Sequence, residues 1–212
     1  MDTNELIKAL AADTQPREPS LSTTWRGAVA MAVALAAIVF FATLGPRPDF
    51  ATSIETIRFL FKFVVTITLA GTALLVAHAL SRPGSAWRRA MPYLAAAPVL
   101  LALAVIFELL ALPPATWSAR LIGTNSVLCL TFIPLIGIGP LAIFLMVLRH
   151  GAPTSPALAG AAAGLLAGGI AAAFYAAHCP DDSPLFVATW YTIAVSILAV
   201  IGAVAANRIA RW

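Results

Sequence analysis

The sequence is poor in charge. Only 10% of its 212 residues are charged, whereas 61% are hydrophobic. Soluble domains are usually about a quarter charged and about 45–50% apolar, so this composition argues against a soluble fold. The few charges form no basic run of the kind that binds nucleic acid. We therefore expect no direct contact with nucleic acid.

Cysteine is also scarce, since Cys129 and Cys179 are the only two. Two such distant cysteines form neither a disulfide framework nor a CxxC zinc motif. The chain contains no serine-hydrolase, HExxH or phosphate-binding glycine motif in a supporting context. Its polar connections are too short to build a soluble active site. These absences predict that the protein is not an enzyme.

The sequence does contain six long apolar blocks. Each has about 18–23 residues, enough for a helix to cross about 30 Å of hydrocarbon. Glycine and proline separate the blocks, as expected at turns between helices. We predict an all-α polytopic membrane protein, with a tail over 1–25 and a six-helix transmembrane domain over 26–212. The expected spans lie near 27–44, 58–80, 91–112, 126–148, 156–177 and 185–206.

The positions of the 13 lysines and arginines predict the orientation. Cytoplasmic segments of inner-membrane proteins carry the excess of positive charge. If both termini are cytoplasmic, four cations lie outside: Arg47, Arg58, Lys62 and Arg120. The other nine then lie inside: Lys8, Arg17, Arg26, Arg82, Arg88, Arg89, Arg149, Arg208 and Arg211. We expect a multi-pass protein of a bacterial inner membrane with both termini inside.

Small residues and tryptophans suggest how the helices meet each other and the bilayer. Gly160 and Gly164 form a GxxxG pattern in the fifth block, which lets another backbone approach closely. This pattern predicts packing inside the bundle, with a homodimer seam as the alternative. Trp190, in the first turns of the last block, is expected to anchor that helix at the membrane interface.

The two cysteines are expected at similar depth near the outer face. Cys129 lies 23 residues before position 152, in the short fourth-to-fifth connection, and Cys179 lies 27 residues after it. The difference corresponds to about 6 Å of helical rise. This permits a reversible thiol pair, and therefore a sensor. The alternative is two unrelated cysteines, one of them packed as a small hydrophobe.

Potential metal ligands cluster around the second cysteine. His178, Asp181 and Asp182 flank Cys179, and thiolate with imidazole suits zinc, cadmium or copper. Adjacent residues rarely complete a site alone, so a transient metal ion would also need Cys129 or a ligand from another loop. The alternative is that the two aspartates cap the last helix along with Ser183, since carboxylates favour the positive helix end.

Two ionisable residues lie well inside apolar blocks. Glu108 lies near the outer end of the third block and Lys62 near the outer end of the second. They could pair, or each could extend toward the interface. A small transporter could instead use them as a proton or cation site.

The polar tail contains one short amphipathic pattern. Leu6, Ile7 and Leu10 fall on one face at helical spacing. A proline-containing linker follows Asp13. This helix could lie on the membrane surface or dock onto a partner.

Several segments of the sequence form a recognisable set: NELIKALAAD (4–13), GPRPD (45–49), Cys129, LRHGAP (148–153) and HCPDDSP (178–184). The most specific is HCPDDSP, which runs toward Trp190-Tyr191. Together these segments resemble the NrsF family of six-span inner-membrane anti-sigma factors.

The resemblance implies a negative regulator that holds a sigma-F-type extracytoplasmic-function sigma factor at the membrane. It also implies release of that factor under oxidative or heavy-metal stress, and a role for Cys129 and Cys179 in the response. Because the tail is the largest inner segment, we expect sigma binding there. The expected binding residues are Leu6, Ile7, Leu10 and Asp13. A transporter, or a structural subunit of a membrane complex, is the alternative.

Overall fold

The computed structural model describes residues 2–12, 20–82 and 84–209, without the side chains of 10–12. Every regular element among these residues is helical, so the predicted all-α class is confirmed for the described chain. Six stretches are long and apolar enough to cross a membrane, as predicted. Short helices occupy the tail and the connections: α1 (Thr3–Ala12), α3 (Phe50–Ser53), η2 (Pro114–Thr116) and α7 (Trp117–Ile122).

The six long stretches differ in regularity. Four are single α-helices: α2 (Leu21–Thr43), α4 (Ile57–Leu80), α8 (Ser126–His150) and α9 (Pro156–Ala176). The third stretch joins α5 (Trp87–Ala90), the 3-10 helix η1 (Met91–Ala95) and α6 (Ala96–Ala111). The sixth joins α10 (Pro184–Phe186), the π-helix η3 (Val187–Tyr191) and α11 (Thr192–Ile209). The sequence pattern did not reveal the π-helix.

Local sequence explains some boundaries. Helix α2 begins at Leu21 rather than near 27, because Ser20 accepts the Thr23 N–H and satisfies a free donor of the first turn. Helix α8 continues as one α-helix through Pro134 and Pro140.

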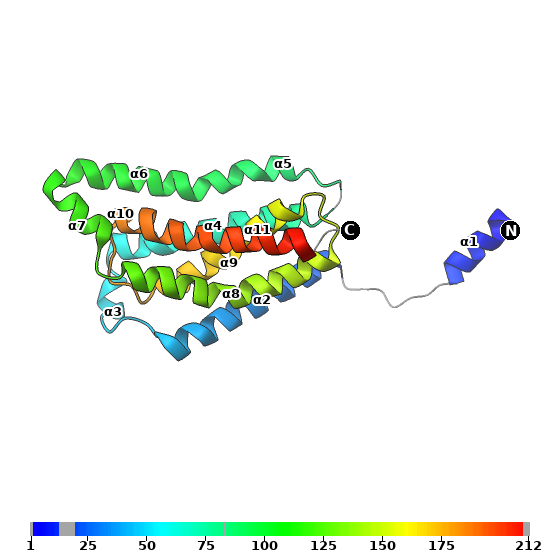
Figure 1. Ribbon diagram of the computed structural model, residues 1–212, viewed down its shortest axis with the longest axis horizontal. Helices are drawn as coiled ribbons and strands as arrows, with labels where there is room; N and C mark the ends of the chain where they lie inside the picture. Colours follow the sequence, from blue (N-terminus) through cyan, green and yellow to red (C-terminus); the bar gives the residue numbers. More distant parts are fainter. Residues whose placement is uncertain (1, 13–19, 83, 210–212) are drawn as a thin grey trace.

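Helix α9 forms the centre of the bundle and packs against α11, α4 and α8. In the 18-residue hydrophobic segment of α9, 67% of the residues are buried, compared with 17% in the equivalent segment of the third stretch. Figure 1 shows α6 running along one edge of the bundle. The third stretch is therefore the most loosely attached of the six.

Glycines make the central packing close. A Cβ atom on Gly160 would lie 2.1 Å from the Gly202 carbonyl oxygen, and one on Gly164 would lie 2.3 Å from the Leu198 oxygen. The backbones of α9 and α11 therefore touch, so the GxxxG pattern serves internal packing. A homodimer stays a prediction, and this glycine face cannot provide its seam.

The bundle has two distinct ends (Figure 1). We call the end with α3, α7 and α10 the loop end, and the end where α2 begins and α11 finishes the terminal end. At the terminal end, Trp25 Nε1 donates to Ser81 Oγ at 3.1 Å, which fastens the start of α2 to the end of α4. The loop end contains both cysteines and most of the buried charge.

Candidate functional site

The candidate site is built on the connection between α9 and α10. The Ala177 carbonyl accepts the Arg47 N–H at 3.1 Å, and His178 Nδ1 donates to the Gly45 carbonyl at 2.9 Å. Both bonds tie this connection to the loop after α2. Residues Asp181, Asp182 and Ser183 follow, and we call them the hub because each binds a different part of the bundle.

Asp181 holds the beginning of α8. Its Oδ2 accepts the backbone N–H groups of Thr124 and Asn125 at 3.0 and 2.9 Å. Helix N-termini attract carboxylates because their first N–H groups lack intrahelical partners. Gly123 makes this approach possible: its φ is +59°, and a Cβ there would lie 2.4 Å from the Phe186 ring. Only glycine can both adopt this positive φ readily and leave room for the Phe186 ring.

Asp182 binds two cations from other elements. Its Oδ1 lies 2.6 Å from Lys62 Nζ, and its Oδ2 lies 3.2 Å from Arg47 Nη1. Lys62 is completely buried and also donates to the Cys179 carbonyl at 2.7 Å. A buried ammonium needs such partners, since an unpaired one is strongly disfavoured in an apolar interior.

The ion pairs continue outward through Arg47 to Asp49. Arg47 binds both oxygens of Asp49 at 2.6 Å. This hydrogen bonding lowers the pKa of Asp49 from its ordinary value of 3.8 to about 2. It also raises the pKa of Arg47. Asp49 therefore stays ionised and holds the Arg47 fork in position for Asp182.

Ser183 binds the third stretch. Its hydroxyl donates to Glu108 Oε2 at 2.8 Å, and the same oxygen accepts the Leu185 N–H at 3.1 Å. Arg120 lies 3.3 Å from the other Glu108 oxygen. Glu108 is only 4% exposed, so these contacts replace the water that an ionised carboxylate would otherwise need.

These contacts correct the expected capping of the last helix. Ser183 occupies the N-cap position, but its side chain makes no cap bond, and Asp181 and Asp182 bind other elements. Glu108 from α6 instead accepts a first-turn N–H of α10. The cap comes from a neighbouring helix because the 178–183 connection directs its own carboxylates toward α8 and α4.

Glu108 and Lys62 do not pair with each other. Each has a cluster of its own, with Arg120 and Ser183 around Glu108 and Asp182 around Lys62. Both side chains are buried rather than extended toward the interface. The loop end therefore has two separate buried charge clusters joined by the hub.

The two thiols lie in a common buried cluster. Both cysteines are free and 0% exposed, and both belong to the same cluster of buried side chains. Tyr175 and Tyr191 complete the cluster, with ring centroids 5.7 Å apart. Burial raises the pKa of the Cys179 thiol, against the opposing effect of the Lys62 ammonium. The structure thus brings Cys129 and Cys179 together without a disulfide between them.

The proposed metal ligands have other partners. His178 Nδ1 binds the Gly45 carbonyl, Asp181 binds the start of α8, and Asp182 binds Lys62 and Arg47. Within residues 2–12, 20–82 and 84–209, no three His, Cys, Asp or Glu side chains are arranged to hold a metal ion. A transient metal ion at the cysteines stays a prediction that would require rearrangement of the hub.

The remaining candidate residues lie apart from the hub. Trp190 Nε1 donates to the Leu121 carbonyl at 2.8 Å and so connects the last stretch to α7. Leu6 and Ile7 lie on α1 and are 43% and 58% exposed. The Leu10 side chain and Asp13 lie outside the described residues.

Sequence reasoning missed several participants. The hub carboxylates accept hydrogen bonds from Arg47, Thr124 and Asn125. Tyr175 and Tyr191 lie in the same buried cluster as the thiols. The sequence could have identified Arg47, since it lies in a proline-bounded loop expected on the same side of the membrane as Asp182. No feature of the sequence identifies the tyrosines, because an aromatic residue in an apolar helix is an ordinary packing residue.

The fold defines a six-helix protein of the membrane-spanning class, with a polar hub joining its loops at one end. Comparison with known families gives the second step: residues 10–212 match the family described as NrsF, negative regulator of sigma F, and the chain belongs to it. It is 35% identical, over 100% of both chains, to anti-sigma-F factor NrsF of Caulobacter vibrioides. It is 33% identical, again over 100% of both, to the probable anti-sigma-F factor NrsF of Azospira oryzae. No solved structure gives a significant match.

Proposed function

We propose that this protein is an inner-membrane anti-sigma factor that binds an extracytoplasmic-function sigma factor through its N-terminal tail. Membership of the NrsF family carries the proposal, because the full-length relatives are named as anti-sigma-F factors. The role is regulatory binding rather than catalysis. Both termini lie in the cytoplasm, and the loop end with its cysteines lies outside, in keeping with the distribution of positive charge.

The tail supplies the binding surface. Leu6 and Ile7 are more than two-fifths exposed on α1, so this described apolar face is available to a partner. A short amphipathic helix binds a groove through side chains at helical spacing, and positions 6, 7 and 10 provide them. The charged residues of the same helix, Glu5 and Lys8, remain in solvent.

A triple variant tests the tail. Replacing Leu6, Ile7 and Leu10 by Asp should release the sigma factor, measured as constitutive sigma-dependent transcription and loss of co-purification. The matched control replaces Glu5 and Lys8 by Gln on the polar face and should leave repression intact. Full repression by the triple variant at normal membrane abundance would exclude this binding surface.

The cysteines supply the stress response. Oxidation or metal capture at Cys129 and Cys179 changes the contact between α8, which contains Cys129, and the connection after α9, which contains Cys179. Such a change shifts the protein between two states, and regulation requires that these states differ in affinity for the sigma factor. The thiols are buried together beside Lys62, so a modification there would also disturb the ion pairs of the hub.

A double substitution tests the sensor separately from the binding surface. Cys129→Ser with Cys179→Ser should abolish induction by oxidant or cadmium while basal repression is retained. If induction and repression both match the unmodified protein, the cysteines are structural packing residues.

A further inference from the structure

A groove runs along the bundle between α2 and α4. Both helices pack against α9 but make few contacts with each other, so α9 forms the floor between them. Three hollows follow one another in this gap. The first lies at the terminal end and shares Val29 and Leu74 with the second, and the second shares Ala173 and Phe174 with the third, toward the loop end. We call this continuous hollow the α2–α4 groove.

The middle of the groove is apolar. Every residue that lines it is apolar or glycine, and its volume is about 330 Å³. Gly71 keeps it open, since a Cβ atom there would meet no other atom within 4 Å. Water finds no polar partner in such a groove, whereas a hydrocarbon chain loses no hydrogen bond by entering it. The middle of the groove therefore suits the acyl chain of a lipid.

The terminal end of the groove is polar. Ser22, Arg26 and His78 line it, around a volume of about 360 Å³. Arg82 lies beside it, because its Nη2 donates to Ser22 Oγ at 2.7 Å and lies 3.2 Å from His78 Nε2. Arg82 uses one nitrogen for both contacts, and the exposed Arg26 side chain has no hydrogen bond or ion pair with any residue in the described part of the chain. Two guanidinium groups with spare donors therefore flank one opening.

The charges of the bundle are divided between its two ends. Within residues 20–82 and 84–209, every side-chain carboxylate lies at the loop end, namely Asp49, Glu55, Glu108, Asp181 and Asp182. The terminal end instead carries arginines: Arg26, Arg82, Arg88, Arg89, Arg149 and Arg208. No carboxylate of these two ranges neutralises them, so the terminal end attracts anions.

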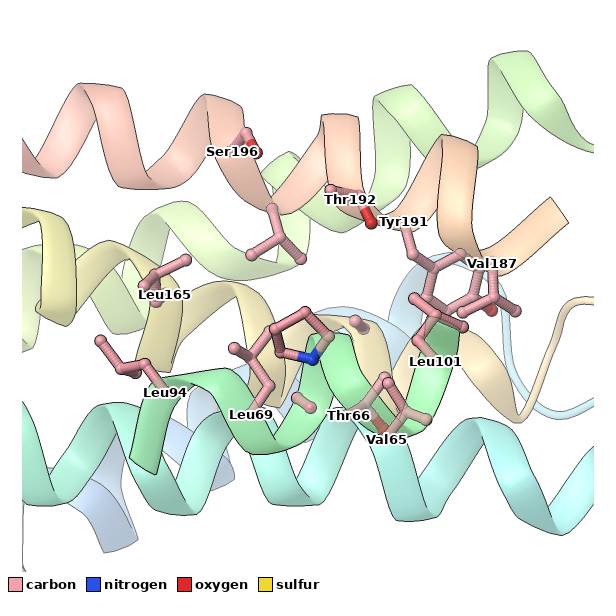
Figure 2. Close-up of a pocket in the computed structure, with 14 residues that line it drawn as sticks. Val65, Thr66, Leu69, Leu94, Leu101, Leu165, Val187, Tyr191, Thr192 and Ser196 are labelled. Carbon is pink, nitrogen blue, oxygen red and sulfur yellow. The ribbon is translucent and has the colours of Figure 1, made fainter. Parts of the chain in front are cut away.

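A second apolar hollow, on another face of α4, provides a contrast (Figure 2). It lies between α4, α6 and the last stretch, and Leu69, Leu101 and Val187 are among the residues that line it. No charged side chain lines this hollow. It therefore has nothing that would select one lipid headgroup over another, whereas the α2–α4 groove combines an apolar channel with two arginines at one end.

We propose that the α2–α4 groove binds an anionic phospholipid, with the phosphate at Arg26 and Arg82 and one acyl chain along the apolar middle. A guanidinium group matches a phosphate because two of its N–H groups can donate in parallel to two oxygens. Basic pockets between membrane-spanning helices on the cytoplasmic side bind anionic headgroups in other proteins. In the proposed orientation the terminal end is cytoplasmic, so the inner leaflet supplies the lipid. The site does not require the sigma factor, so its failure would leave the proposed function intact.

Native mass spectrometry of the delipidated full-length protein in a neutral detergent tests the proposal. The probes are dioleoyl phosphatidylglycerol, which carries a net negative charge, and dioleoyl phosphatidylcholine, which carries none. We expect one phosphatidylglycerol per chain to bind about tenfold more tightly than phosphatidylcholine. Equal affinity for the two lipids would overturn the proposal, because the arginines would then recognise no headgroup.

Two double variants test the arginines. Arg26→Gln with Arg82→Gln should remove the preference for phosphatidylglycerol, a loss of about tenfold. The matched control, Arg89→Gln with Arg208→Gln, removes the same charge from exposed positions of α5 and α11 outside the groove lining and should keep the preference. Equal losses in the two double variants would show a diffuse attraction to the terminal end and would overturn the site.

A substitution in the middle of the groove tests the acyl chain. Gly71→Phe places a ring in the groove and should eliminate the saturable binding of phosphatidylglycerol. Gly27→Phe is the matched control: its Cβ position is equally open but lies outside the groove lining, so binding should be retained. Binding that survives Gly71→Phe would place the lipid elsewhere. A dimer without bound lipid would mean that a second chain fills the groove, and either result would overturn the proposal.

Discussion

Lys62 Nζ lies 2.7 Å from the Cys179 carbonyl oxygen, although 117 residues separate the two in the chain. The same nitrogen binds Asp182, so one buried cation holds both the cysteine backbone and the hub. Lys62 also belongs to α4, which ends where Ser81 receives the Trp25 bond from α2. Helix α4 therefore spans about 28 Å between the cysteines and the beginning of the helix that follows the tail.

The first prediction concerns this cation. Lys62→Met keeps the apolar stem but leaves Asp182 and the Cys179 carbonyl with fewer partners, so we expect a loss of about 1–3 kcal/mol in unfolding free energy. Thermal unfolding in detergent would measure it. Arg58→Met, an exposed cation on the same helix, is the control and should change stability by less than about 0.5 kcal/mol. A Lys62 variant as stable as the control would mean that the ion pair contributes nothing.

The second prediction concerns the close contact of α9 and α11. Gly160→Ala places a Cβ atom against the Gly202 carbonyl, and backbone cannot rotate away as a side chain can. We expect destabilisation of about 1–3 kcal/mol, as for other overpacked sites. Gly71→Ala is the matched control: it has open space around its Cβ position and should gain up to about 1 kcal/mol from helix propensity. If Gly160→Ala and Gly71→Ala shift the melting temperature in the same direction, the prediction for the α9–α11 contact is contradicted.

The third prediction concerns thiol accessibility. Both cysteines are fully buried, and burial raises the pKa of the Cys179 thiol, so little reactive thiolate is present near neutral pH. Maleimide labelling of the folded protein, followed by mass spectrometry, should be slow and should become complete on unfolding. Ser118→Cys, introduced into a cysteine-free background at an exposed position, should label rapidly. Equal labelling rates for the natural and the introduced thiols would show that the cluster opens readily.

The fourth prediction concerns pH. The Asp49 carboxyl has a pKa of about 2 in the folded protein, against an ordinary value of 3.8. A lowered folded pKa stabilises the folded state above about pH 4, and this contribution is lost as the pH falls through about 2. The melting temperatures of the unmodified protein and Asp49→Asn should therefore differ by a constant amount above about pH 4 and converge near pH 2. A difference that persists unchanged at pH 2 would contradict the assigned ion pair.

The sequence predicted how far along each span a residue lies much better than it predicted which neighbouring helix the side chain faces. Long apolar blocks and punctuating prolines identify six spans, and the count from the fourth-to-fifth connection put both cysteines at similar depth. The same information does not say which side of each helix faces which neighbour. Glu108 and Lys62 were both expected near one end, and both lie there, but α6 and α4 direct them to different partners.

The sequence does not show which elements come together in space, and this also explains why the capping of the last helix was predicted wrongly. Asp181 and Asp182 precede a helix start, and local rules assign them to that start. The fold instead brings the beginning of α8 and the buried Lys62 closer to them. The π-helix at 187–191 has a similar origin, because no local residue pattern marks it and its geometry depends on packing against neighbouring helices.

The hub also constrains the order of assembly. Its three residues lie just before the final span, and they bind the connections and helices that emerge earlier from the ribosome. Chains fold from the N-terminus during synthesis, so the first five spans cannot form their contacts with the hub until residues 181–183 have been synthesised. Insertion of the last helix then closes all these contacts together. A chain interrupted before that point would display Lys62 without Asp182, Glu108 without Ser183 and the α8 N–H groups without Asp181. These are polar groups by which membrane quality control can distinguish an unfinished protein from a complete one.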